Sequence, residues 1–314
     1  MLLAVPTAAV GAVGGALWAR SSSDATAQAP APAGGPAGPT RAGTGRGTGT
    51  GTGTATASPG DSPTVVPRGP AAVTQTTFHS VARGRSVAMV VVSPFVGALD
   101  GLSVCLVLHG RGDDARRGVA LLGLDAALAD AARAGARAGT APFVAVAVDG
   151  GETYWHPRAS GDDPEKMIIA EVLPRLADQG LRTTKLAAFG WSMGGYGALL
   201  LAERHPDLVV AVAASSPAMW QTASATAAGA FGSAADFTAH QVLGKPPAPG
   251  VTYRIDCGQS DPFYAVSRQA ATELAATETG FGKGGHDPAF WRAALPAQLA
   301  FVGRALAHTA PRNP

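Results

Sequence analysis

The sequence predicts an α/β domain with a mainly parallel central sheet that helices cover on both faces. From residue 71 onward, short runs rich in β-branched residues alternate with longer Ala- and Leu-rich stretches of helical periodicity. The strand-like runs are continuously apolar, which is typical of strands that are buried on both faces. The chain from residue 71 to residue 314 is long enough to bury one substantial core.

The expected elements follow one another in regular alternation. The expected strands are residues 86–92, 103–108, 143–148, 185–189, 209–214 and 251–257. The expected helices are residues 119–132, 165–178, 194–205, 264–277 and 288–308. The second helix has the clearest signals, because Asp163 can cap its start, Pro164 suits its first turn and Gly180 suits its end.

The first 70 residues differ in composition from the rest. Residues 2–19 are apolar and precede a small-residue cleavage candidate, Ala25-Thr26-Ala27, so residues 1–29 are expected to be a signal peptide or a membrane anchor. Residues 30–70 are rich in Gly, Pro and Thr and are expected to form a disordered linker. Either expectation for residues 1–29 predicts a secreted or cell-envelope protein, with possible attachment to a membrane or a wall. A cytosolic protein is the weaker alternative.

Composition excludes several classes of protein. The chain has 24 basic and 22 acidic residues, a net charge of +2, and no basic stripe, so nucleic acid is not an expected partner. Cys105 and Cys257 lie in apolar runs without metal-ligand spacing and are expected to be buried free thiols, with a disulfide as the alternative. No cluster of metal-ligating residues and no phosphate-binding loop is evident, so neither a metal nor a cofactor is expected.

The segment Gly190-Trp191-Ser192-Met193-Gly194 stands between an apolar strand and an Ala/Leu helix. A Gly-x-Ser-x-Gly segment in this position forms a sharp turn that exposes the serine, and side chains at the two glycines would collide across it. The amides at the start of the following helix favour negative charge beside the serine. We therefore expect Ser192 to be a catalytic nucleophile, and a plain tight turn is the alternative.

A serine nucleophile needs a general base, and His286 is the best candidate. It lies in a loop just before a helix that Asp287 can cap, where an imidazole can reach the carboxyl edge of the sheet. A structural role for His286 is the alternative. The other histidines after Ser192 are less suited: His205 leaves with the helix, His240 lies in a polar stretch, and His308 is near the end of the chain.

The base needs an acid to orient it, and Asp261 follows the strand at 251–257 by one short turn. That is the carboxyl-end position that such an acid requires, with a helix N-cap as the alternative role. Asp256 lies within the strand and is the lesser candidate. Asp236 comes too early in the chain.

An oxyanion in the reaction needs two preorganised backbone donors. The amide of Met193, directly after the serine, is expected to be one donor. The amide of Arg111, in the loop that follows the strand at 103–108, is expected to be the other. His109 in the same loop is expected to shape it by packing or hydrogen bonding.

The segments around Ser192, Asp261 and His286, together with the loops after the strands at 103–108 and 143–148, resemble the esterase D-like (putative esterase) family. This family is a branch of the α/β-hydrolase superfamily related to exported mycolyltransferases. The resemblance covers about residues 75–308 and is most specific around Ser192. It implies the α/β-hydrolase fold, a triad of Ser192, Asp261 and His286, and oxyanion amides from Arg111 and Met193. The segments that carry it are Leu108–Gly112, Asp149–Gly151, Tyr154–Arg158, Gly190–Gly197, Asp261–Phe263 and Gly284–Asp287. The chain departs from the family at residues 277–283, which are short and barely apolar, so the last strand is expected to be degenerate or missing.

Two segments are candidates for the substrate side of the site. Trp155, His156 and Arg158 follow a central strand and are expected to line the pocket; the alternative is that Trp155 packs and Arg158 pairs with Asp162 or Asp163. Residues 216–250 form an insertion that is expected to make a small lid.

The sequence therefore predicts an exported serine esterase that acts on a small-molecule ester through an acyl-enzyme, with its oligomeric state left open. The first alternative is an acyltransferase that uses a sugar or another alcohol in place of water. The second is a catalytically silent cell-wall protein that keeps the fold.

Overall fold

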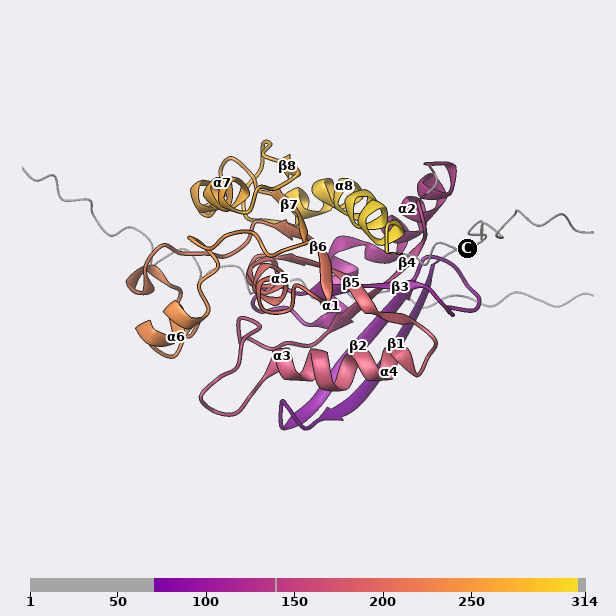
Figure 1. The fold of residues 1–314 in the computed structure, drawn as a ribbon, viewed down its shortest axis with the longest axis horizontal. Helices are drawn as coiled ribbons and strands as arrows, with labels where there is room; N and C mark the ends of the chain where they lie inside the picture. The colour runs from indigo at the N-terminus through magenta and orange to yellow at the C-terminus, as the bar shows by residue number, and fades with distance from the viewer. Residues whose placement is uncertain (1–70, 139, 310–314) are drawn as a thin grey trace, which may run out of the picture. The chain divides into compact units, whose positions relative to one another are not determined.

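A computed structural model describes residues 71–138 and 140–309 of the chain (Figure 1). The described residues form an eight-stranded sheet in the order β1-β2-β4-β3-β5-β6-β7-β8. The strands are β1 (Ala72–Ser80), β2 (Arg85–Ser93), β3 (Ser103–Leu108), β4 (Phe143–Val148), β5 (Arg182–Trp191), β6 (Val209–Ser215), β7 (Thr252–Asp256) and β8 (Glu278–Gly280). β1, β2 and β4 pair antiparallel, and every other neighbouring pair is parallel. The predicted mainly parallel α/β sheet is thus confirmed.

Helices connect the parallel strands, because a crossover between parallel strands needs a long connection. They are α1 (Ala115–Leu122), α2 (Leu124–Ala138), α3 (Pro164–Met167), α4 (Leu173–Ala177), α5 (Met193–Arg204), α6 (Ala234–Ala239), α7 (Tyr264–Glu273) and α8 (Pro288–Ala307). A π-helical segment, η1 (Ile168–Val172), joins α3 to α4, and a 3-10 turn, η2 (Ala223–Ala225), precedes α6.

Alternate side chains of each central strand enter two separate apolar layers. In β3, Val104, Leu106 and Leu108 join the layer that the α3–α4 helix and α5 cover. Cys105 and Val107 join the layer on the other face, beneath α1, α2 and α8. Figure 1 shows α8 and the α3–α4 helix on opposite sides of the sheet. Both faces are therefore buried, which is why the strands read as continuously apolar.

Two helices differ from the prediction for local reasons. The helix predicted at 119–132 is two helices, because Gly123 adopts a left-handed conformation (φ 60°) and ends α1. The helix predicted at 165–178 is present and is capped by Asp163 with Pro164 in its first turn, but it contains η1. Pro174 has no N–H to donate and its ring conflicts with the carbonyl one turn earlier, so the hydrogen-bond ladder widens before it.

The two ends of the sheet also differ from the prediction. β1 was missed, although residues 72–80 pair along their whole length with β2. β8 has three residues and pairs in parallel with β7, so the last strand is degenerate but present.

The predictions for residues 1–29 and 30–70 lie outside the described residues. Among the residues that the structure does describe, no helix is both long enough and apolar enough to cross a membrane. Cys105 and Cys257 are free and buried, so the thiols are as predicted.

Candidate active site

Ser192 stands at the turn from β5 to α5 with φ 53° and ψ −121°, a backbone conformation that residues other than glycine rarely adopt. Its amide donates to the carbonyl of Ser215 at 2.9 Å, which ties the turn to β6. A Cβ at Gly190 would overlap the backbone of Gly194, and a Cβ at Gly194 would overlap the carbonyl of Leu108. Only glycines at these two positions allow the chain to turn so sharply.

The structure brings together the three side chains that the sequence singled out. His286 Nε2 lies 2.9 Å from Ser192 Oγ, and His286 Nδ1 lies 2.9 Å from Asp261 Oδ2. Asp261 follows β7, and His286 precedes α8, whose first amides the Asp287 side chain caps. Three segments far apart in the sequence therefore meet at the carboxyl edge of the sheet in the order that acyl-transfer chemistry requires.

The loops that carry Asp261 and His286 are joined by backbone hydrogen bonds. Beyond the short β8, the amide of Gln259 donates to the carbonyl of Gly282 at 2.8 Å, and the amide of Ser260 donates to the carbonyl of Gly284 at 2.9 Å. A Cβ at Gly258 would overlap the carbonyl of Gly284. This close approach fixes the histidine loop against the aspartate loop and replaces the pairing that a longer β8 would give.

Asp261 is held in its ionised form. Burial would raise the pKa of this carboxyl, but the hydrogen bond and charge of His286, together with the amide of Phe263 at 2.8 Å, outweigh burial and lower the pKa below its usual value. An ionised Asp261 favours the tautomer of His286 in which Nδ1 carries the proton, so that Nε2 can accept the proton of Ser192.

Two aromatic rings flank the imidazole and were not anticipated as site residues. The ring of Phe263 lies 5.3 Å from that of His286, centroid to centroid, and Trp291 meets it edge to face at 5.2 Å. The Trp291 indole N–H donates to Ser216 Oγ at 3.2 Å, which fixes its orientation. The position of Trp291 in the first turn of α8 was the only sequence signal for this role.

The two predicted oxyanion donors lie at the ends of adjacent strands. Met193 is the first residue of α5, so its amide has no acceptor within the helix. Arg111 is in the turn after β3, and Leu108 of β3 pairs with Gly190 of β5. His109 is buried in this turn, where its Nε2 accepts the amide of Gly150 at 2.9 Å. His109 thus ties the ends of β3 and β4 together.

Trp155 and His156 are buried, whereas Arg158 is partly exposed. Trp155 is 3% exposed, and its ring packs against Gly150 and Gly197. Packing was the alternative role that the sequence left open for Trp155. The side chain of His156 is fully buried.

The Arg158 guanidinium donates to the carbonyls of Gly229 and Ala230. The alternative ion pair of Arg158 with Asp162 or Asp163 is not found among the described residues, although the backbone amide of Arg158 donates to the Asp162 carbonyl at 2.9 Å. Asp162 instead pairs with Arg83 and Arg85, and Asp163 caps α3. The sequence contained no signal that the insertion at 216–250 would fold back onto Arg158.

The insertion contributes aromatic rings, one of which contacts Phe263, the neighbour of His286. Trp220 contacts Phe263, the neighbour of His286, edge to face at 5.5 Å, and contacts Tyr154 at 5.7 Å. Phe231 meets Trp220 edge to face at 6.4 Å. The insertion is therefore packed against the site by aromatic contacts.

The remaining acid and base candidates have other partners. Asp256 accepts hydrogen bonds from Arg254 at 2.7 Å and from Gln298 at 2.7 Å, so it faces α8. His205 lies 2.8 Å from a carboxylate oxygen of Glu165.

A serine on a strand–turn–helix elbow, with a histidine and an aspartate in hydrogen-bonding sequence on a sheet of this order, defines the class of α/β hydrolases. The chain belongs to the Putative esterase family, whose model matches residues 93–302. It is thus a carboxylic ester hydrolase by family.

Several solved structures share this fold. A ferulic acid esterase is 21% identical with a TM-score of 0.64, over 75% of this chain and 99% of that one. The S-formylglutathione hydrolase of Agrobacterium tumefaciens is 17% identical with a TM-score of 0.59, over 74% and 95%. The fluorophosphonate-binding serine hydrolase FphF of Staphylococcus aureus is 16% identical with a TM-score of 0.57, over 74% and 99%. No curated protein sequence matches the chain.

Proposed function

We propose that this protein is a serine esterase in which Ser192, His286 and Asp261 form the catalytic triad. The observation that supports this proposal most is the pair of 2.9 Å contacts that link the serine to the histidine and the histidine to the aspartate. Ser192 Oγ attacks the ester carbonyl carbon while its proton passes to His286 Nε2. The tetrahedral intermediate then collapses, and His286 gives that proton to the departing alcohol.

The resulting acyl-enzyme is hydrolysed by the reverse use of the same groups. Water attacks the acyl carbon, His286 takes its proton and returns one to Ser192 Oγ, and the carboxylic acid leaves. The amides of Met193 and Arg111 are the proposed donors to the oxyanion in both steps, because one begins the helix behind the serine and the other follows the adjacent strand.

The test is covalent labelling together with turnover. We expect a fluorophosphonate to modify Ser192 stoichiometrically and Ser192→Ala to lower the hydrolysis of p-nitrophenyl acetate by about 10³-fold or more. Ser224→Ala, at an exposed serine in the insertion, is the matched control and should keep both properties. Unchanged turnover in Ser192→Ala would disprove the mechanism, and absence of labelling in folded wild-type protein would favour the catalytically silent alternative.

A substrate panel identifies the preferred acyl group, and an added alcohol acceptor then separates hydrolysis from transfer. It should contain p-nitrophenyl esters of increasing acyl length, methyl ferulate and S-formylglutathione, because the last two carry the groups named for similar structures. Partitioning of the acyl group to an added disaccharide far above its molar share would favour the acyltransferase alternative.

We also propose that the protein is exported, on the basis of the apolar stretch at residues 2–19 and the small residues at 25–27. Amino-terminal sequencing of protein recovered from a bacterial culture medium tests this. Retention of intact protein inside the cells would contradict it.

A further inference from the structure

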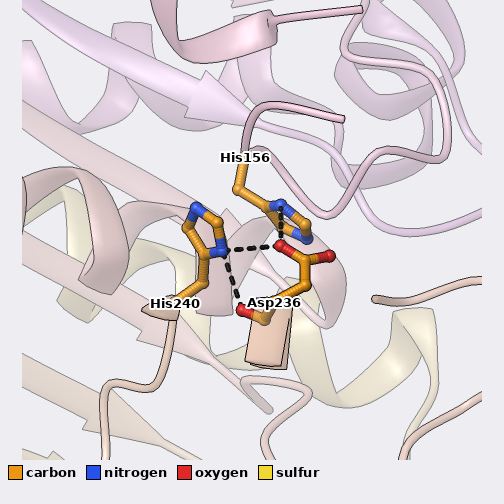
Figure 2. Close-up of side chains that lie close together, drawn as sticks. All are labelled: His156, Asp236 and His240. Carbon is orange, nitrogen blue, oxygen red and sulfur yellow. Dashed lines mark hydrogen bonds and ion pairs between the residues drawn. The ribbon is translucent and has the colours of Figure 1, made fainter. Parts of the chain in front are cut away.

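Three potential metal ligands meet outside the proposed active site. His156 lies in the loop after β4, whereas Asp236 and His240 are one helical turn apart at α6 in the insertion, so they share a face. Figure 2 shows the Asp236 carboxylate beside the two imidazole rings, with dashed lines from one of its oxygens to a nitrogen of each ring. One ligand atom from each residue lies within 4.8 Å of the others. Sequence reasoning did not find this cluster, because His156 precedes Asp236 by about 80 positions.

The distances between these ligand atoms suit a small divalent ion. Asp236 Oδ1 is 3.0 Å from His240 Nδ1 and 3.8 Å from His156 Nδ1. Ligand atoms in a tetrahedral zinc site are about 3.3 Å apart, given metal–ligand bonds of about 2.0–2.1 Å. The two rings stack with centroids 4.3 Å apart and planes 26° apart, so coordination requires the His240 ring to turn about its side-chain bonds. His240 follows the last turn of α6, and this turn of the ring replaces the present 2.9 Å contact of His240 Nδ1 with the backbone carbonyl of Asp236.

The surroundings orient two of the ligands as metal ligands are usually oriented. Asp236 Oδ2 accepts the amide of Gly232 at 2.6 Å, which leaves Oδ1 directed toward the rings. His156 Nε2 lies 3.1 Å from the carbonyl of Ala230, an acceptor for a proton on that nitrogen. Ligand histidines commonly donate their second N–H to a backbone carbonyl in this way, which fixes the tautomer that binds metal.

The neighbours of His156 determine which of its two ring nitrogens carries a proton. Arg158 opposes binding, because its guanidinium lies 3.0 Å from His156 Nε2 and favours the other tautomer, whose Nδ1–H would donate to the Pro157 carbonyl at 3.0 Å. A metal ion at Nδ1 would have to select the first tautomer.

We propose that His156, Asp236 and His240 bind one divalent transition-metal ion, of which Zn²⁺ is the best suited. Two imidazole nitrogens and one carboxylate oxygen favour Zn²⁺, Co²⁺ or Ni²⁺ over Ca²⁺ and Mg²⁺, which prefer oxygen ligands. The ion joins α6 of the insertion to the loop after β4. It therefore fixes the segment whose Trp220 and Phe231 extend toward the proposed active site, and its role is structural.

The experiment uses the untagged full chain, treated with a chelator and then titrated with Co²⁺. We expect one equivalent to bind and to give the visible absorption of a four- or five-coordinate cobalt site, which Zn²⁺ then removes. Asp236→Asn and His240→Asn should each weaken Co²⁺ binding by about 100-fold or more. His79→Asn, at an exposed histidine on the edge strand β1, should bind Co²⁺ like the wild type.

Thermal unfolding gives a second readout on the wild-type protein. Zn²⁺ at about 100 times its Kd should raise Tm by about 5–10 °C, because it binds only the folded chain, and this rise should be absent in the two ligand variants. The proposal is wrong if the wild type binds no stoichiometric Co²⁺ and its Tm does not respond to Zn²⁺. It is equally wrong if folded Asp236→Asn and His240→Asn, as judged by near-UV circular dichroism, bind Co²⁺ as tightly as His79→Asn does.

Discussion

Ser192 adopts a strained backbone conformation that costs about 1–3 kcal/mol on its own, and its neighbours hold it there. The Ser215 carbonyl accepts its amide, and Gly190 and Gly194 let the chain fold back at this point. The sequence could predict this residue because the strain demands glycine at fixed positions. It could not predict Trp291 as the neighbour of His286, because a tryptophan in a helix has no such pattern around it.

The lowered pKa of Asp261 makes a prediction about stability and pH. A carboxyl whose pKa is lower in the folded state stabilises the fold above its unfolded pKa of about 3.9, and this contribution is lost as the pH falls through the folded value. We expect the difference in unfolding free energy between the wild type and Asp261→Asn to persist from pH 7 to pH 5 and to shrink below about pH 4. Urea unfolding at each pH measures it.

Activity gives an independent check on the same variant. Asp261→Asn should lower kcat by about 10⁴-fold, because an amide favours the wrong tautomer of His286. A stability difference that disappears between pH 7 and pH 5 would show that the pKa of Asp261 is raised rather than lowered.

At the scale of elements, the parallel strands and most of the helices could be predicted from apolar runs and capping residues. β1 was missed because an edge strand is exposed on one side and carries the polar run Thr74-Gln75-Thr76-Thr77 in place of a continuous apolar one. The break at Gly123 was missed because a single glycine within a helical pattern is often tolerated. Sequence patterns predict an edge strand less well than a central strand, because one side of an edge strand has no neighbouring strand to pack against.

The contact between Gly258 and Gly284 leads to a prediction at this scale. Gly258→Ala places a Cβ against the Gly284 backbone, so the loop that carries His286 must shift. A shift of about 1 Å in a catalytic group costs about 10²-fold in rate, so we expect kcat/KM to fall by about 10- to 100-fold while the fold is retained. Hydrolysis of p-nitrophenyl acetate and far-UV circular dichroism measure the two properties.

Gly282→Ala is the matched control in the same loop. A Cβ at Gly282 meets no atom within 4 Å, so this variant should retain kcat/KM within about twofold. Equal activity of the two variants would show that the close approach at Gly258 does not position His286.

At the scale of the whole molecule, the meeting of Ser192, Asp261 and His286 could be expected because parallel strands bring their carboxyl ends to one edge. The return of the insertion onto Arg158 and His156 could not, because nothing in residues 216–250 encodes a partner in the loop after β4. Long-range contacts between irregular segments depend on the finished fold.

A buried ionic network joins the sheet to α8 and carries a prediction about global stability. Asp256 is 1% exposed and accepts from Arg254 of the same strand and from Gln298 of α8. Asp256→Leu leaves the largely buried Arg254 guanidinium with Glu278 as its remaining carboxylate partner, so we expect the free energy of unfolding to fall by about 3 kcal/mol, the low end of the range for a broken buried pair. Urea unfolding measures this loss.

The double variant Arg254→Met with Asp256→Leu separates the pair from the packing around it. Because both charges are gone, the double variant should recover much of the stability that Asp256→Leu loses. A double variant less stable than the single one would show that the ion pair itself stabilises the fold.

The two buried thiols have a consequence for how the protein can be handled. Burial raises the pKa of Cys105 and raises that of Cys257 to about 12, so neither forms a thiolate at neutral pH while the chain is folded. The fold needs no oxidising compartment, and the protein can be produced in a reducing cytoplasm without mispaired bridges. Iodoacetamide can alkylate these thiols only after the core opens. The rate of alkylation therefore measures the rate of opening without an engineered label.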